Sequence, residues 1–166
     1  MKRRYSLSLA FLTSLFIYLF YRSEKTVVNE LITLILPDET YVNIKIGIVD
    51  AVPLNTLIIF SLPGGLWVFC ATVLSRDFYL RIKNQKIQLS LLPALFAIGL
   101  EFSQLIHLTN GRFDLWDILF YLLFWLIASY SNKVGQSQKN ILSPLTLHGF
   151  TCLVCFVSVY LAHVNN

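Results

Sequence analysis

The chain has 166 residues, of which 56% are hydrophobic and only 13% are charged. Its mean hydropathy of +0.66 predicts an integral membrane protein. At about 20 residues for each spanning helix, the length allows about five crossings and leaves no room for a separate catalytic domain. The net charge of +4 does not indicate nucleic-acid binding, because the basic residues lie beside apolar segments and are not interleaved with aromatic ones.

The first apolar run, residues 6–21, follows a basic start, "MKRR", in the manner of a signal peptide. The run is long and aromatic and no small-x-small site follows it, so we expect an uncleaved anchor with its N-terminus in the cytoplasm. Residues 22–53 then form a predicted extracytoplasmic loop. Within it, the pattern of 27–36 predicts a surface helix and the alternation in 41–49 predicts an extended piece.

Four further apolar runs predict the remaining spans: 54–75, broken at 63–65 by "LPGG", then 87–107, 115–130 and 145–164. The predicted fold is an all-α membrane protein, a single transmembrane domain over residues 1–166 with about five helices. With the N-terminus inside, nine of the 13 basic residues fall on the cytoplasmic side. That asymmetry predicts an N-in/C-out, multi-pass protein of the bacterial cytoplasmic membrane.

The stretch "GLEFSQLIHLTNGRFDLWDILFYLLF", residues 99–124, places ionisable groups in the middle of apolar sequence. A carboxylate inside a membrane costs at least ~2.5 kcal/mol, so Glu101 is expected to face the protein interior and to have a partner. Glu101, Gln104 and His107 share a helix face, as do Asp114, Asp117 and Tyr121 on the following helix. A tight turn makes the two helices antiparallel neighbours, so both polar faces are expected to converge.

Some of these polar groups also have ordinary explanations. Asp114 has the position of a helix N-cap, and an acidic residue in a first turn interacts favourably with the helix dipole. Arg112, at the turn, would pair with Asp114 or Asp117, and His107 would be an interfacial anchor. Glu101 has no such local explanation. The candidate ligand-binding residues are Glu101, Gln104, Arg112, Asp114 and Asp117.

The segment Pro63, Gly64 and Gly65 is a further candidate for the same site. Proline followed by two glycines can break a helix and restart it, which would direct free N–H groups toward an anion. A simple kink, or close approach of a neighbouring helix to the glycines, is the alternative. The cysteines, including the "CLVC" pair, lie in apolar runs and are expected to be packing residues.

On "EFSQ", "GR" and "DLWD" the chain resembles the VanZ-like family of small bacterial membrane proteins. The motif residues are Glu101, Gln104, Arg112 and Asp117. The family pattern has asparagine where this chain has Tyr121, and a small residue where it has Phe124. The resemblance covers about 30 residues. It implies a multi-pass envelope protein linked to glycopeptide (teicoplanin) susceptibility or cell-envelope maintenance.

Three functions follow from these observations. The first is a polar outer-leaflet pocket that binds an anionic ligand such as a lipid-linked phosphate or cell-wall precursor, with membrane lipids as neighbours and no cofactor. The second is a metal-assisted intramembrane enzyme acting on a lipid phosphate, with Mg²⁺ between Glu101, Asp114 and Asp117 and Glu101 as general base. The third is a small proton-linked carrier subunit, which would need oligomerisation.

Overall fold

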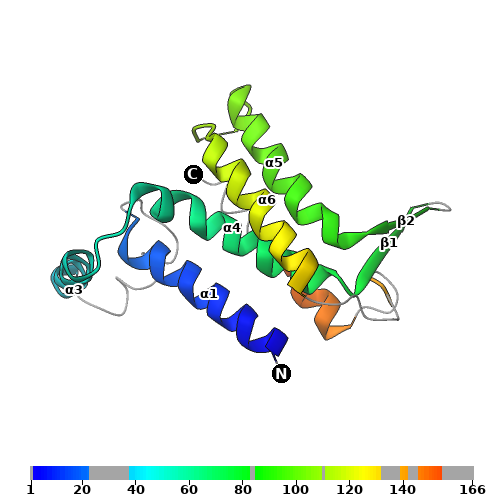
Figure 1. Ribbon diagram of the computed structural model, residues 1–166, viewed down its shortest axis with the longest axis horizontal. Coiled ribbons are helices and arrows are strands. Elements are labelled where there is room, and N and C mark those ends of the chain that lie inside the picture. The colour runs from blue at the N-terminus through cyan, green and yellow to red at the C-terminus, as the bar shows by residue number, and fades with distance from the viewer. Residues whose placement is uncertain are drawn as a thin grey trace.

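The computed structural model describes residues 2–22, 38–82, 85–109, 111–131, 139–141 and 146–154. Its helices and strands are α1 Lys2–Phe20, α3 Asp38–Ala51, α4 Thr56–Ser75, β1 Phe78–Ile82, β2 Gln85–Gln88, α5 Leu92–Leu105, α6 Leu115–Ser131 and β3 Lys139–Asn140. A 3₁₀ turn, Leu89–Leu91, joins β2 to α5, and residues 147–154 are helical. Figure 1 shows α5 and α6 as neighbouring antiparallel helices, with α4 and α1 beside them and the β1–β2 hairpin projecting from the start of α5.

Helix α4 is the centre of the packing, because α1, α5 and α6 all contact it. The Asn55 side chain begins this helix by accepting a hydrogen bond from the Leu57 N–H at 3.3 Å. The contacts of α4 with its neighbours form two apolar clusters. One joins α4 to α1 and α6 and contains Ala10, Leu66, Phe69, Val73 and Ala128; the other joins it to α5 and α6 and contains Val68, Ala94, Ala97 and Tyr121.

The predicted bundle of five transmembrane helices is wrong. Among the described residues only α4 is long and apolar enough to cross a membrane, and half of its most apolar window is buried inside the protein. The other apolar helical stretches have at most 17 residues. The hydropathy pattern cannot distinguish burial against protein from burial against lipid, and α4 is a core helix here. The predicted N-in/C-out topology and the predicted multi-pass location in the bacterial cytoplasmic membrane are therefore wrong as well.

The all-α assignment is also wrong, because the basic segment after α4 forms a sheet. Strands β1 and β2 pair antiparallel, and β3 adds to the other side of β1 in parallel, giving the order β2-β1-β3. In β1 the apolar Phe78 and Leu80 alternate with Tyr79 and Arg81, which is the period of a strand with one buried face. That face packs on Leu89, Ile141 and Cys152 in a third apolar cluster.

A buried arginine connects the start of this sheet to the end of α6. The Arg76 guanidinium donates to the carbonyls of Ala128 and Ser129, both at 3.2 Å. These carbonyls lie in the last turn of α6, where they lack partners within the helix and where the helix dipole favours a cation. Arg76 therefore caps α6, and the polypeptide turns directly from this cap into β1.

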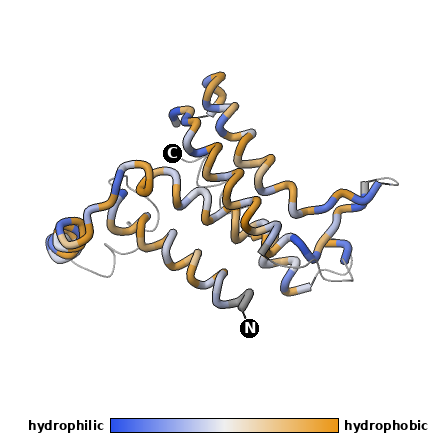
Figure 2. Tube along the Cα trace, viewed as in Figure 1, coloured by the Kyte–Doolittle hydropathy of each residue, from blue (hydrophilic) through white to orange (hydrophobic). Residues whose placement is uncertain are grey.

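The predicted extracytoplasmic loop, 22–53, contains a helix where an extended piece was expected. Residues 41–49 belong to α3, which the hydroxyl of Tyr41 fastens to the Leu19 carbonyl at the end of α1 (2.6 Å). The predicted surface helix 27–36 lies outside the described residues, as does most of the run 145–164. In Figure 2 the helices α1, α4, α5 and α6 are largely hydrophobic, whereas the β1–β2 hairpin alternates between hydrophobic and hydrophilic residues.

The predicted break at 63–65 is absent, because α4 continues through Pro63 without interruption. Both glycines of "LPGG" are needed for packing instead. A Cβ at Gly64 would lie 2.7 Å from the Tyr121 ring, and one at Gly65 would lie 2.6 Å from the Phe124 ring. The glycines therefore allow α4 and α6 to approach closely, and the aromatic rings of α6 fill the space that two side chains would occupy.

Candidate functional site

The polar residues between α5 and α6 converge on Glu101, which is only 3% exposed. Its Oε2 accepts a hydrogen bond from the backbone N–H of Asp114 at 3.2 Å. Its Oε1 accepts from the Tyr121 hydroxyl, also at 3.2 Å. A buried carboxyl is costly unless its oxygens are hydrogen-bonded, and here both oxygens are. Glu101 therefore fastens α5 to the residue that precedes α6 and to the second turn of α6.

Gln104, one turn further along α5, ties the same carboxyl to the turn. In the amide orientation that satisfies both of its ends, Nε2 donates to Glu101 Oε2 at 3.3 Å and to the Arg112 carbonyl at 3.1 Å. The neighbouring Gly111 has a φ of +125°, and a Cβ there would lie 2.7 Å from the Gln104 amide. Only glycine adopts this φ without strain and leaves room for the Gln104 amide, which explains the glycine of "GR".

Two helix caps set the geometry of this turn. Helix α5 ends in a Schellman motif: the Leu108 N–H donates to the Ser103 carbonyl at 2.8 Å, and the His107 N–H donates to the Gln104 carbonyl at 3.0 Å. His107 holds the left-handed position of this motif, with a φ of 58°. At the start of α6, Asp114 Oδ1 accepts from the Trp116 N–H at 2.9 Å and caps the helix.

Burial and nearby negative charges set the electrostatics of the cluster. Burial raises the pKa of Glu101, and the negative charges of Asp117 and Asp114 raise it further, while the hydrogen bonds from the Asp114 N–H and Tyr121 lower it. Burial, together with the charges of Asp117 and Glu101, also raises the pKa of Tyr121 far above its usual range. Tyr121 therefore stays protonated and donates to Glu101.

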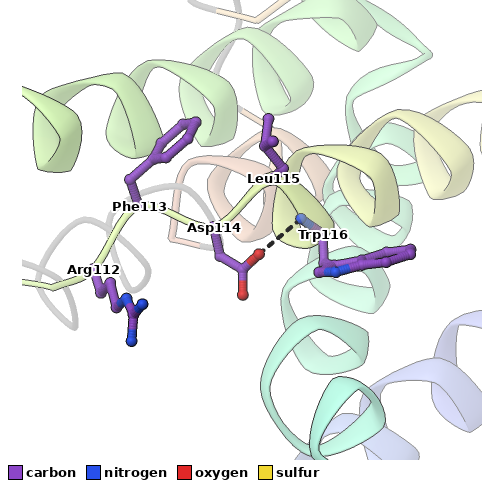
Figure 3. A pocket seen from close by; sticks show the side chains of 5 residues that line it. All are labelled: Arg112, Phe113, Asp114, Leu115 and Trp116. Carbon is purple, nitrogen blue, oxygen red and sulfur yellow. Dashed lines mark hydrogen bonds between the residues drawn. The ribbon is translucent and has the colours of Figure 1, made fainter.

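Arg112 lies in a separate and open part of the site. An open hollow of about 460 Å³ is lined by residues 112–116, and Glu101 and Gln104 do not line it. In Figure 3 the side chains of Arg112 and Asp114 point to one side of the segment, whereas Phe113 and Leu115 point to the other. The Arg112 side chain is exposed, and within the described part of the chain its guanidinium forms no ion pair or hydrogen bond.

The predicted site residues thus fall into three groups. Glu101, Gln104 and Asp114 are brought together by hydrogen bonds, and Asp117, in the first turn of α6, is near enough for its charge to act on Glu101. Arg112 contacts this group through its backbone carbonyl alone. The third group, the "LPGG" segment, packs against Tyr121 and Phe124 and presents no helix N-terminus, because α4 is continuous.

The sequence prediction missed Tyr121 as a member of the site. This residue is buried and has a hydrogen bond to Glu101. The sequence placed it on the converging face of Asp114 and Asp117, but it was not included among the candidate ligand-binding residues. Among the described residues no group of three or more His, Cys, Asp or Glu side chains is arranged to hold a metal ion.

Comparison of the chain with protein-family models, with curated proteins and with solved structures gives no match.

Proposed function

We propose that this chain is a VanZ-like binding protein whose α5–α6 turn binds an amphipathic ligand through its phosphate group. Arg112 is the residue that contacts the phosphate. The buried cluster around Glu101 does not touch the ligand in this proposal and instead fixes the turn that carries Arg112. The observation that supports it best is an exposed guanidinium beside a hollow, held at its backbone by a buried hydrogen-bond network.

The chemistry of Arg112 favours an oxyanion. A guanidinium presents several N–H donors in a planar fork, which matches two oxygens of a phosphate group. Gln104 bonds the Arg112 carbonyl, so the backbone at this position is fixed before any ligand arrives. Preorganisation of this kind lowers the entropy lost on binding.

The surroundings of Arg112 favour a ligand with an apolar part. Leu108, Leu115 and Trp116 are 74%, 66% and 50% exposed beside the polar turn. They offer a surface for a hydrocarbon chain or ring attached to the phosphate. Asp114 lies on the same side as Arg112 and repels additional negative charge, so a single phosphate is preferred to a more highly charged group.

Binding of farnesyl phosphate below its aggregation concentration tests the proposal, with farnesol as the uncharged comparison. Wild-type protein is expected to bind the phosphate in preference to the alcohol. Arg112→Ala should weaken binding of the phosphate about tenfold, since a charge-assisted hydrogen bond contributes about 1.5 kcal/mol or more. Lys139→Ala, which removes an exposed cation from β3, is the matched control and should bind like wild type.

Equal affinity for farnesol and farnesyl phosphate, or full affinity in Arg112→Ala, would refute the assignment. The resemblance to the VanZ-like family adds a cellular expectation. Loss of the gene product, and replacement by the Arg112→Ala form, should change cell-envelope integrity or teicoplanin susceptibility in the same direction. If cells carrying Arg112→Ala behave like wild type, Arg112 is not required for the envelope or teicoplanin phenotype.

A further inference from the structure

The outer face of the small sheet carries two cations opposite each other. Arg81 in β1 and Lys86 in β2 are paired in register, so their side chains lie on the same face. Tyr79 lies on that face too, and the Lys86 Nζ is 5.2 Å from the centroid of its ring. Like charges directly opposite in a sheet destabilise the pairing, so this arrangement is not explained by the stability of the sheet itself.

The sheet offers these cations no negative charge. Its strands read "FYLRI", "QKIQ" and "KN", without an acidic residue, and both Arg81 and Lys86 are exposed. Within the described residues neither side chain forms an ion pair, and Lys86 lies against the ring of Tyr79. The outer face of the hairpin is therefore a positive surface that an anion would neutralise.

The helix that follows the hairpin exposes an apolar stripe. Leu91, Leu95, Gly99, Phe102 and Leu105 follow one another at intervals of three or four residues and are all exposed, so they lie along one face of the helical segment. Leu95 is 61% exposed and Phe102 is 53% exposed. The exposed face of a helix in a globular protein is normally polar. An apolar stripe of this extent indicates a surface that something apolar covers.

We propose that the outer stripe of α5 and the Arg81–Lys86 pair together bind an anionic phospholipid surface. The stripe would enter the boundary between headgroups and acyl chains, while the two cations contact the headgroup phosphates. A second copy of this chain fits less well, because it would present the same cations, whereas anionic lipid supplies both the missing charge and an apolar phase. Figure 1 shows the hairpin continuing directly into α5, so the two parts are adjacent.

Co-sedimentation with vesicles tests this proposal, with phosphatidylcholine alone compared with an equal mixture of phosphatidylcholine and phosphatidylglycerol. Wild-type protein should sediment with the mixed vesicles and largely remain in solution with the neutral ones. The double substitution Arg81→Gln and Lys86→Gln should lower partitioning about thirtyfold, from two charges near the surface. Lys139→Gln is the control, because β3 places it in register with the buried Phe78 and hence on the opposite face.

The apolar part has its own test, in which Leu95→Gln should lower partitioning, whereas Val42→Gln, which changes an exposed apolar residue of α3, should partition like wild type. Unchanged partitioning of the double variant would overturn the proposal, and so would equal binding to neutral vesicles. Concentration-dependent dimerisation that Leu95→Gln abolishes, without vesicle binding, would assign the stripe to a second copy instead. The outcome is independent of the proposed function, because Arg112 lies at the other end of α5 and Arg112→Ala should still bind the mixed vesicles.

Discussion

Replacing Glu101 with leucine should strongly destabilise the protein, because it removes one acceptor from three donors at once. The Asp114 N–H, the Tyr121 hydroxyl and the Gln104 amide all donate to this carboxyl. A buried donor left unsatisfied costs about 1–3 kcal/mol. The apolar leucine recovers some free energy because the carboxyl no longer has to be desolvated, so we expect Glu101→Leu to lower the free energy of unfolding by about 3–5 kcal/mol.

Glu101→Gln should cost less, about 1–2 kcal/mol, because one oxygen still accepts and the repulsion by Asp114 and Asp117 disappears. Urea unfolding followed by tryptophan fluorescence measures both values. Glu39→Gln, which changes an exposed carboxyl in α3, is the control and should unfold like wild type. A leucine variant that is as stable as the glutamine variant would show that the hydrogen bonds to Glu101 do not hold the turn.

The remaining predictions concern pH and the two helix contacts. Because the pKa of Glu101 is raised in the folded state, the unfolded state loses its proton at lower pH, and the free energy of unfolding of the wild type should fall as pH rises from about 4.5 through the raised pKa. Glu101→Gln should lack this slope. A pH profile of Glu101→Gln parallel to that of the wild type would contradict the assignment to Glu101. Gly65→Ala should lower the free energy of unfolding in urea by about 1–3 kcal/mol, and Phe124→Leu should restore part of this loss. Gly99→Ala, with open space around it, should leave the free energy of unfolding unchanged or raise it slightly. His107→Gly should raise the free energy of unfolding by about 0.5–1 kcal/mol by relieving a left-handed backbone, and a loss of stability would assign the imidazole a contact of its own.

The convergence of the polar residues could be predicted from the sequence because it depends on local rules. The spacing of Glu101 and Gln104 places both on one helix face, and a short turn brings the next helix back alongside. Asp114 has the residue type and position of an N-cap, and the structure has it in that role. The alternative in which Arg112 pairs with a neighbouring carboxylate is not seen among the described residues, because its side chain is exposed and lines the hollow.

The sheet could not be predicted in the same way. The "FYLRI" segment alternates as a strand does, but its position between the predicted spans 54–75 and 87–107 indicated a basic cytoplasmic loop. The strand also depends on β3, which pairs with it from residues 139–140 far along the chain. For the "LPGG" segment the sequence left two interpretations open, a helix break and the close approach of a neighbouring helix. The structure has the close approach: Gly64 and Gly65 lie against Tyr121 and Phe124 while α4 stays helical, and only tertiary structure decides between the two.

The close fit between the glycines of α4 and the rings of α6 constrains how this sequence can evolve. A larger residue at position 65 is compatible with the fold only if position 124 becomes smaller, and the same holds for positions 64 and 121. Position 121 is coupled further, because a residue without a side-chain hydrogen-bond donor there leaves one oxygen of Glu101 without its partner. Related sequences with asparagine at position 121 or a small residue at position 124 should therefore have bulkier residues in the "LPGG" segment. Positions 64 and 121, and positions 65 and 124, should covary.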